Sequence, residues 1–202
     1  MDMKRVSKYM WLVFLFCATV VPFYGCASEN AAAAPKIGNP LPDFELKDLN
    51  GTVHTLKQYA GKIVVLEMCS MECPWSKGAD PHLVALSKKH ADDGVVFLGI
   101  DSHFGHTVEA IKDYAEKNGK SYPILKDVDN KFADAVGAKT TPEVYVVDKE
   151  GKLAYHGAFD NRQQETQEGD KAYVADAIAA LLAGNAPDPS EAKSWGCSIK
   201  RK

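Results

Sequence analysis

The sequence predicts an α/β fold with a mixed central sheet flanked by helices, and three observations carry this prediction. Two β-branched runs, at residues 63–68 and 95–100, have the composition of strands buried on both faces. Each run is followed by a segment whose apolar residues recur at helical spacing. A hairpin pattern and an alanine-rich helix close the chain, so strands alternate with helices before an antiparallel end.

Local signals set the bounds of the elements. Pro74 favours a helix start, Thr107 is a suitable N-cap, and Asn118-Gly119 ends the helix that Thr107 begins. Lys149-Glu-Gly151 is a hairpin turn, and a run with two prolines at 185–190 breaks the last helix. In chain order, strands are expected at 44–46, 52–55, 63–68, 95–100, around 124, 144–147 and 153–156. Helices are expected at 74–90, 107–117, 131–136 and 171–182, with one helical turn at 56–59.

Composition and charge narrow the classes of function. The chain has 202 residues, 46% of them apolar and 25% charged, with a net charge of -3. This composition excludes a disordered chain and a strongly basic nucleic-acid binder. The charge is uneven, because residues 1–26 and 184–202 each carry +2 and residues 27–183 carry -7. We therefore expect no nucleic-acid partner.

The N-terminus has the pattern of an export signal. Lys4, Arg5 and Lys8 precede an almost wholly apolar run at residues 9–24, which is shorter than the roughly 20 residues of a membrane span. Phe23-Tyr-Gly-Cys26 resembles a bacterial lipobox, in which the cysteine is lipidated. Cleavage after Ala27 and an uncleaved membrane anchor are the alternatives. We expect export to the bacterial periplasm or to an extracytoplasmic membrane surface.

Four segments follow from these observations. Residues 1–27 are the signal peptide or lipoprotein signal, and residues 28–35 are a linker of small residues. The folded domain spans residues 36–183, and residues 184–202 are expected to form an irregular tail that contains Cys197.

The five cysteines are an odd number, which excludes a closed set of disulfides. Cys17 and Cys26 belong to the export signal, so Cys69, Cys73 and Cys197 remain. Cys73 comes between a strand and a helix, at or beside the N-cap, where backbone N–H groups and the helix dipole stabilise a thiolate. This position predicts a reactive thiol, and a buried inert cysteine is the alternative.

Four motifs make the chain resemble the thioredoxin-like superfamily, in particular its redoxin branch of AhpC/TSA and TlpA/ResA-like proteins. They are the leader at 37–46, the segment Gly61-Lys-Ile-Val-Val-Leu66, the cysteine turn, and Gly137–Pro142 followed by 144–151. The resemblance implies a thioredoxin-like fold with an N-terminal strand extension. It also implies that Thr141-Pro142 carries a cis-proline packed against the active cysteine.

The chain departs from the usual Cys-x-x-Cys motif at the second position. Cys73-Pro-Trp-Ser76 has serine there, so another thiol must resolve a mixed disulfide on Cys73. Cys69 and Cys197 are the two candidates, and proximity in sequence favours Cys69. A structural Cys69–Cys73 disulfide is a third possibility.

Glu67 is a charged residue within an apolar strand. The resemblance implies that a buried acid at this place accepts a proton in catalysis, whereas an outward-facing glutamate would have no such role. Trp75 and Trp195 either shape a substrate groove or serve only in packing.

We predict an exported thiol–disulfide oxidoreductase that uses Cys73 as nucleophile, needs no cofactor and acts on protein disulfides or thiols. Ser70 before Cys73 resembles a peroxiredoxin motif, so peroxide is an alternative substrate, although Arg162 does not lie in the context that such enzymes require.

Two further classes are alternatives. Cys69 and Cys73 resemble the ligands of Sco-type copper proteins and suit Cu(I), and His103 and His106 follow a strand that could end at the same sheet edge. A catalytically silent thioredoxin-like binding domain is the remaining alternative.

Overall fold

A computed structural model describes residues 34–202. The predicted export signal, with Cys17 and Cys26, and most of the predicted linker lie outside these residues. Among the residues that are described, no helix has both the length and the hydropathy needed to cross a membrane.

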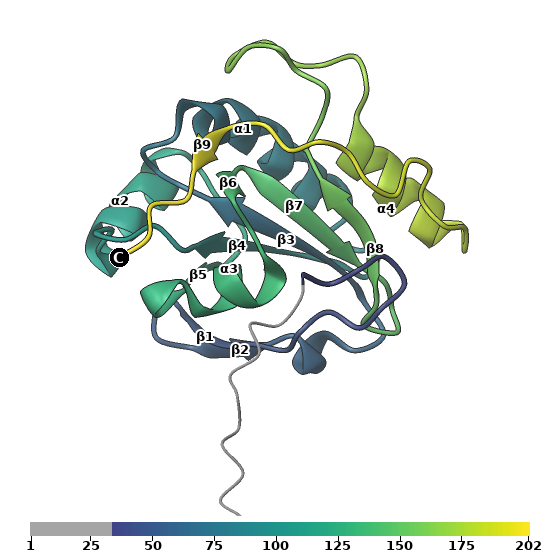
Figure 1. Cartoon of the computed structure of the whole chain (residues 1–202), viewed down its shortest axis with the longest axis horizontal. Coiled ribbons are helices and arrows are strands. Elements are labelled where there is room, and N and C mark those ends of the chain that lie inside the picture. The colour runs from purple at the N-terminus through teal and green to yellow at the C-terminus, as the bar shows by residue number, and fades with distance from the viewer. Residues whose placement is uncertain (1–33) are drawn as a thin grey trace, which may run out of the picture. The chain divides into compact units, whose positions relative to one another are not determined.

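A seven-stranded mixed sheet forms the centre of the domain, with the strand order β2-β1-β5-β4-β3-β7-β8 (Figure 1). β3, β4 and β5 are parallel, and β1, β7 and β8 run antiparallel to their neighbours. The bounds of these strands are β1 Glu45–Asp48, β2 Val53–Thr55, β3 Ile63–Cys69, β4 Val95–Asp101, β5 Ile124–Lys126, β7 Glu143–Val147 and β8 Leu153–Gly157. The predicted mixed sheet and its N-terminal strand extension are therefore confirmed.

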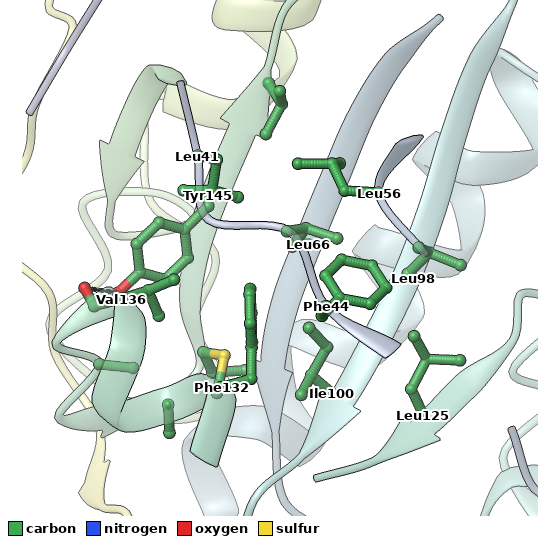
Figure 2. Close-up of a cluster of buried hydrophobic side chains, with 14 of the residues drawn as sticks. Leu41, Phe44, Leu56, Leu66, Leu98, Ile100, Leu125, Phe132, Val136 and Tyr145 are labelled. Atoms are coloured by element: carbon green, nitrogen blue, oxygen red, sulfur yellow. Dashed lines mark hydrogen bonds between the residues drawn. The ribbon is translucent and has the colours of Figure 1, made fainter. Parts of the chain in front are cut away.

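All seven residues of β3 are buried, as expected from its β-branched run, and β3 lies at the centre of the domain. Its alternate side chains supply two separate hydrophobic cores. Figure 2 shows the first core, in which Phe44 and Phe132 meet edge to face with 5.1 Å between ring centroids, beside Leu66 of β3. The second core lies on the other face, where Val65 of β3 packs with α1 and α4. Burial on both faces stabilises β3 by the hydrophobic effect and holds its C-terminal end in place.

Four helices cover the sheet: α1 Pro74–Lys89, α2 Val108–Lys117, α3 Lys131–Val136 and α4 Tyr173–Leu182. Short 3₁₀ turns occupy Lys57–Tyr59 and Val128–Asn130. Thr107 caps α2 as predicted, because its side chain accepts a hydrogen bond from the backbone N–H of Ala110. These bounds agree with the sequence-based ones to within about two residues.

The C-terminal tail differs from the expectation of an irregular segment. Cys197–Ser198 forms a short strand, β9, that pairs antiparallel with β6, Thr140–Thr141 (Figure 1). Pairing continues through the backbone N–H of Ile199, which donates to the carbonyl of Lys139 at 2.9 Å. Two-residue strands are too short to show any apolar periodicity, so the sequence contains no signal for this pairing.

Candidate active site

Cys73 lies where β3 gives way to α1. It is the N-cap of α1 in an extended conformation, and Pro74 occupies the first helical position as predicted. Three residues separate it from Cys69, the last residue of β3, and the backbone N–H of Cys73 closes the turn by donating to the carbonyl of Ser70. The thiol therefore sits at the positive end of the α1 dipole.

The thiol of Cys73 is buried, with 2% of the residue exposed, and its Sγ donates to the carbonyl oxygen of Thr141 at 2.9 Å. Burial raises the pKa of Cys73, but hydrogen bonds from the Cys197 thiol, from Thr141 and from the Ser76 backbone outweigh it and lower the pKa. The Thr141 hydroxyl is buried without another partner, so it is free to donate to a thiolate. Cys73 is therefore the thiol of this site that ionises most readily.

Cys197 lies next to Cys73 because of the β6–β9 register. It stands opposite Thr141 in the pairing and is half-buried, and the carbonyl of the same Thr141 accepts a hydrogen bond from the Cys73 thiol. Burial, followed by the hydrogen bond and the charge of Cys73, raises the pKa of Cys197. The two thiols thus have opposite shifts, and Cys197 is the partner that keeps its proton.

Gly196 brings the tail into close contact with the Thr141-Pro142 bond, which is cis as the resemblance implies. Gly196 has φ +126°, and a Cβ at this position would lie 2.1 Å from the Thr141 carbonyl oxygen. Only glycine fits this contact. The tail therefore lies directly on the segment that carries the cis-proline.

The side chain of Cys69 packs in a different hydrophobic cluster, apart from Cys73 and Cys197. It is buried at the end of β3 and packs with Ile111, Ala115 and Ile124 from α2 and β5. Its Sγ would lie 3.3 Å from a Cβ at Gly99. Burial raises the pKa of Cys69 well above its ordinary value, and Cys69, Cys73 and Cys197 are all free thiols. The structure therefore contains no Cys69–Cys73 disulfide, and the residue paired with Thr141, the hydrogen-bond partner of Cys73, is Cys197.

Glu67 is buried in a charged network behind Cys69. Its Oε2 accepts from Lys120 Nζ at 3.1 Å and from the Tyr122 hydroxyl at 2.8 Å, and Lys120 also donates to Asp80 at 2.6 Å. Its second oxygen, Oε1, is buried without a partner. Burial raises the pKa of Glu67, while Lys120 opposes this shift. The sequence indicated Glu67, but it carried no signal that Lys120 and Asp80 would join it, because they come from distant elements.

Aromatic residues line the side of the site away from Cys69. The rings of Trp75 and Trp195 are 5.2 Å apart, and Trp195 Nε1 donates to the carbonyl of Asp160 at 2.7 Å. The Arg162 guanidinium packs on Trp195 at 5.1 Å. It pairs with the Asp160 carboxylate through two hydrogen bonds of 2.9 Å. Arg162 is therefore engaged by Asp160 rather than directed at the Cys73 thiol.

His103 and His106 follow β4, at the same sheet edge as Cys73. They gather with Glu72, and the ligand atoms of these three residues all lie within 4.8 Å of one another. Neither Cys69 nor Cys73 belongs to this group, so the residues suggested for Cu(I) and the two histidines do not form one cluster. Glu72 had no role in the sequence-based analysis, because a single exposed glutamate carries no signal.

Comparison with known proteins identifies the relatives of this site and fold. Residues 37–156 match the AhpC/TSA family. The chain is 30% identical over 151 residues to thiol-disulfide oxidoreductase ResA of Geobacillus thermodenitrificans. This alignment covers 74% of this chain and 84% of the relative. ResA of Bacillus subtilis is 25% identical over 142 residues, covering 70% of this chain and 78% of the relative.

Solved structures agree with this relationship. A hypothetical protein, SMc02350 from Sinorhizobium meliloti, superposes with a TM-score of 0.77 at 28% identity, covering 85% of this chain and 97% of that one. An uncharacterized conserved protein from Geobacillus kaustophilus has a TM-score of 0.76 at 31% identity, covering 83% and 93%. A putative thiol:disulfide interchange protein DsbE from Chlorobium tepidum, at 16% identity and a TM-score of 0.60, shares the fold. The chain therefore belongs to the AhpC/TSA family, has a thioredoxin-like fold, and is related within that family to the ResA thiol–disulfide oxidoreductases.

Proposed function

We propose that this protein is a thiol–disulfide oxidoreductase in which Cys73 is the nucleophile and Cys197 is the resolving thiol. One observation carries the proposal: the Cys73 thiol, at the N-cap of α1, donates to the carbonyl of Thr141, and Thr141 pairs directly with Cys197 of the tail. The position of each thiol assigns the roles, because Cys73 lies at the positive end of the α1 dipole, which stabilises a thiolate, whereas Cys197 lies on the two-residue strand β9.

The reaction consists of two thiol–disulfide exchanges. The Cys73 thiolate attacks one sulfur of a substrate disulfide, forms a mixed disulfide and releases the other substrate sulfur as a thiolate. Cys197 then gives its proton to that thiolate and attacks the Cys73 sulfur, which releases the second substrate sulfur. The substrate gains two electrons, and the protein is left with a Cys73–Cys197 disulfide that a reduced dithiol protein can reopen. The same steps in reverse oxidise a substrate dithiol.

Cys197 is a better resolving candidate than Cys69, which sequence proximity favours. Cys69 is enclosed by apolar side chains, and burial disfavours the thiolate that resolution requires. Cys197 is half-buried and already in contact with Cys73. We assign Cys69 a packing role against α2.

Thr141 and Pro142 position the nucleophile in this proposal. The Thr141 carbonyl holds the neutral Cys73 thiol, and the Thr141 hydroxyl is available to stabilise the thiolate. Because Cys73 is buried beneath the tail, a protein substrate reaches the thiol only when β9 leaves β6. The exposed edge of β6 would then accept an extended segment of the substrate by strand addition.

Glu67 remains the candidate for a buried proton acceptor. Its raised pKa brings its titration closer to neutral pH, and its free Oε1 can receive a proton. Its neighbours place it beside Cys69 rather than Cys73, so we propose that it acts on the site through the electrostatic field of the Glu67–Lys120–Asp80 network.

The proposal also includes export of the protein from the cytoplasm. The basic and apolar N-terminal pattern supports export across a bacterial membrane, with attachment through a lipidated Cys26 or an uncleaved segment as the alternatives to a released form. In such an oxidising compartment, disulfides of exported proteins are the substrate class that this chemistry fits.

Disulfide mapping and insulin-disulfide reduction with single cysteine variants test the cysteine assignment. We expect Cys73→Ser to abolish reduction, and Cys197→Ser to trap a mixed disulfide on Cys73. Cys69→Ala, which keeps a small apolar side chain, should retain activity and serves as the matched control. A native Cys69–Cys73 disulfide, or full activity in Cys197→Ser, would overturn the resolving assignment. Thiol-dependent Cu(I) uptake without disulfide reduction would favour the copper alternative.

A further inference from the structure

The turn before α1 and the loop after β4 bring three metal-ligating side chains together. Glu72 immediately precedes Cys73, and His103 and His106 belong to the segment between β4 and α2. One ligand atom from each residue lies within 4.8 Å of the other two, and in residues 34–202 this is the one such group of three. The ligands of a tetrahedral zinc ion are roughly 3.4 Å apart, so a shift of about one ångström would complete the geometry.

His106 is oriented as a metal ligand. Its Nδ1 is 2.7 Å from Oδ2 of Asp101, a carboxylate that is 1% exposed, so the ring proton lies on Nδ1. In the neutral ring Nε2 carries the lone pair, and this atom is buried and has no hydrogen-bond partner. Glu72 Oε2 is the nearby carboxylate oxygen, at 3.6 Å from Nε2. A buried polar atom without a partner calls for an explanation, and a carboxylate behind a histidine is the usual support of a metal ligand.

His103 stacks on His106, with 4.8 Å between ring centroids and 25° between ring planes. His103 is buried, as His106 is, so the two rings lie together beneath the surface. The backbone N–H of Lys200 lies 3.4 Å from Nδ1 of His103, so this ligand also contacts the C-terminal tail.

The surrounding charge suits a divalent cation. Lys126 donates to the second oxygen of Asp101 and to the carbonyl of His103, both at 2.8 Å, which neutralises one of the two nearby carboxylates. The carboxylate of Glu72 remains, and its side chain is 63% exposed and free to move toward the histidines. Two imidazoles and one carboxylate form a ligand set that zinc prefers over magnesium or calcium.

We propose that Glu72, His103 and His106 form a Zn²⁺ site, with Asp101 orienting His106 and a solvent molecule as the fourth ligand. The site goes beyond the proposed thiol chemistry, because it uses none of the cysteines. A bound ion would tie the turn that carries Cys73 to the loop after β4. The backbone N–H of Phe104 in that loop donates to the carbonyl of Lys200 at 2.8 Å, which links the loop to the tail that carries Cys197.

Calorimetric titration with ZnCl₂ tests the site in the full chain, stripped of metal by a chelator and carrying Cys73→Ser and Cys197→Ser to remove competing thiolates. We expect one ion per chain. We also expect Glu72→Gln and His106→Ala to raise the Kd for Zn²⁺ by about tenfold or more. His82→Ala is the matched control, because His82 pairs with Glu168 at 3.4 Å elsewhere on the protein and should leave the Kd unchanged.

A second measurement identifies the ligands without reference to activity. With Co²⁺ in place of Zn²⁺, a nitrogen and oxygen site gives visible ligand-field bands without the charge-transfer bands of a cobalt–thiolate bond. No binding in the Cys73→Ser, Cys197→Ser background, or equal affinity in Glu72→Gln and His82→Ala, would overturn the proposal. Because Glu72 is exposed, Glu72→Gln keeps the test valid even if His106→Ala does not fold. Loss of the thiol chemistry alone would leave this site intact.

Discussion

Cys197 stands directly opposite Thr141 in the β6–β9 pairing, and the carbonyl of Thr141 accepts a hydrogen bond from the thiol of Cys73. A cysteine of the C-terminal tail thereby lies beside the N-terminus of α1, where Ser76 occupies the second cysteine position of the usual Cys-x-x-Cys motif. The pairing links the position of the tail to the reactivity of the nucleophile, and most of the predictions below depend on it.

Substitution of Gly196 should open the site. In Gly196→Ala the new Cβ would lie 2.1 Å from the Thr141 carbonyl oxygen, at a φ of +126° that alanine rarely adopts, so β9 should leave β6. We expect faster alkylation of Cys73 in the reduced protein and slower formation of the Cys73–Cys197 disulfide, both followed by mass spectrometry. Ser198→Ala, an exposed change in the same strand, is the control. Unchanged alkylation in Gly196→Ala would show that the tail does not shield Cys73.

Removal of the Cys197 hydrogen bond should raise the pKa of Cys73. Because hydrogen bonds hold this pKa below its ordinary value, the thiolate forms at lower pH than in a free cysteine. In Cys197→Ala we expect a higher pKa for Cys73, hence less thiolate at neutral pH. The pH dependence of thiolate ultraviolet absorbance measures the change.

Cys197→Ser provides the comparison for this prediction, because its hydroxyl can still donate to Cys73. In Cys197→Ser the pKa of Cys73 should lie between its values in the wild type and in Cys197→Ala. Cys69→Ala should leave the titration of Cys73 unaltered. An equal pKa in all variants would contradict the assigned hydrogen bond.

Protonation of Glu143 should destabilise the segment that carries β6. The backbone N–H groups of Lys139 and Thr140 donate to its Oε2 at 2.9 and 3.0 Å. Burial raises the pKa of Glu143, but the His156 hydrogen bond and these N–H groups lower it to about 2. This carboxylate therefore stabilises the fold fully above about pH 4.5, by about 3 kcal/mol, and loses that contribution as the pH falls toward 2.

Urea unfolding across this pH range, with Glu143→Gln for comparison, measures the contribution. The difference in free energy of unfolding between wild type and variant should be largest near neutral pH and shrink as the pH falls toward 2. A difference independent of pH would mean that Glu143 contributes by packing rather than by charge.

Replacement of Lys120 should be strongly destabilising. Its side chain is 1% exposed and holds Glu67 and Asp80, so Lys120→Met leaves two buried carboxylates without their cation. We expect a loss of about 3–5 kcal/mol in the free energy of unfolding, measured with urea. Lys117→Met removes the exposed pair with Asp113 and should cost less than about 1 kcal/mol. Similar losses in both variants would contradict the buried network.

Much of the architecture could be predicted from the sequence because local patterns determine it. The β-branched run of β3 produced a strand buried on both faces, and Thr107 capped α2 as its residue type indicates. Cys73 at the N-cap of α1 followed from the order of strand, cysteine and proline. Each of these features depends on residues close together in the chain, so periodicity and capping rules apply to them.

The partners of Cys73 depended on contacts that no local pattern records. Only three residues separate Cys69 from Cys73 in sequence, yet the alternation of side chains along β3 directs Cys69 into the packing against α2. Likewise, Glu67 met Lys120 and Asp80 only because the sheet and two helices converge behind it.

The sequence by itself determined that this protein is an α/β redoxin with a cysteine at a strand-to-helix junction. The tertiary structure alone decided that Cys197 is the thiol beside it and that Glu72 meets His103 and His106. The physical reason is that a two-residue strand, or a cluster drawn from two loops, gains its stability from backbone pairing and burial between segments far apart in the chain. Such contacts leave no periodic trace in the sequence.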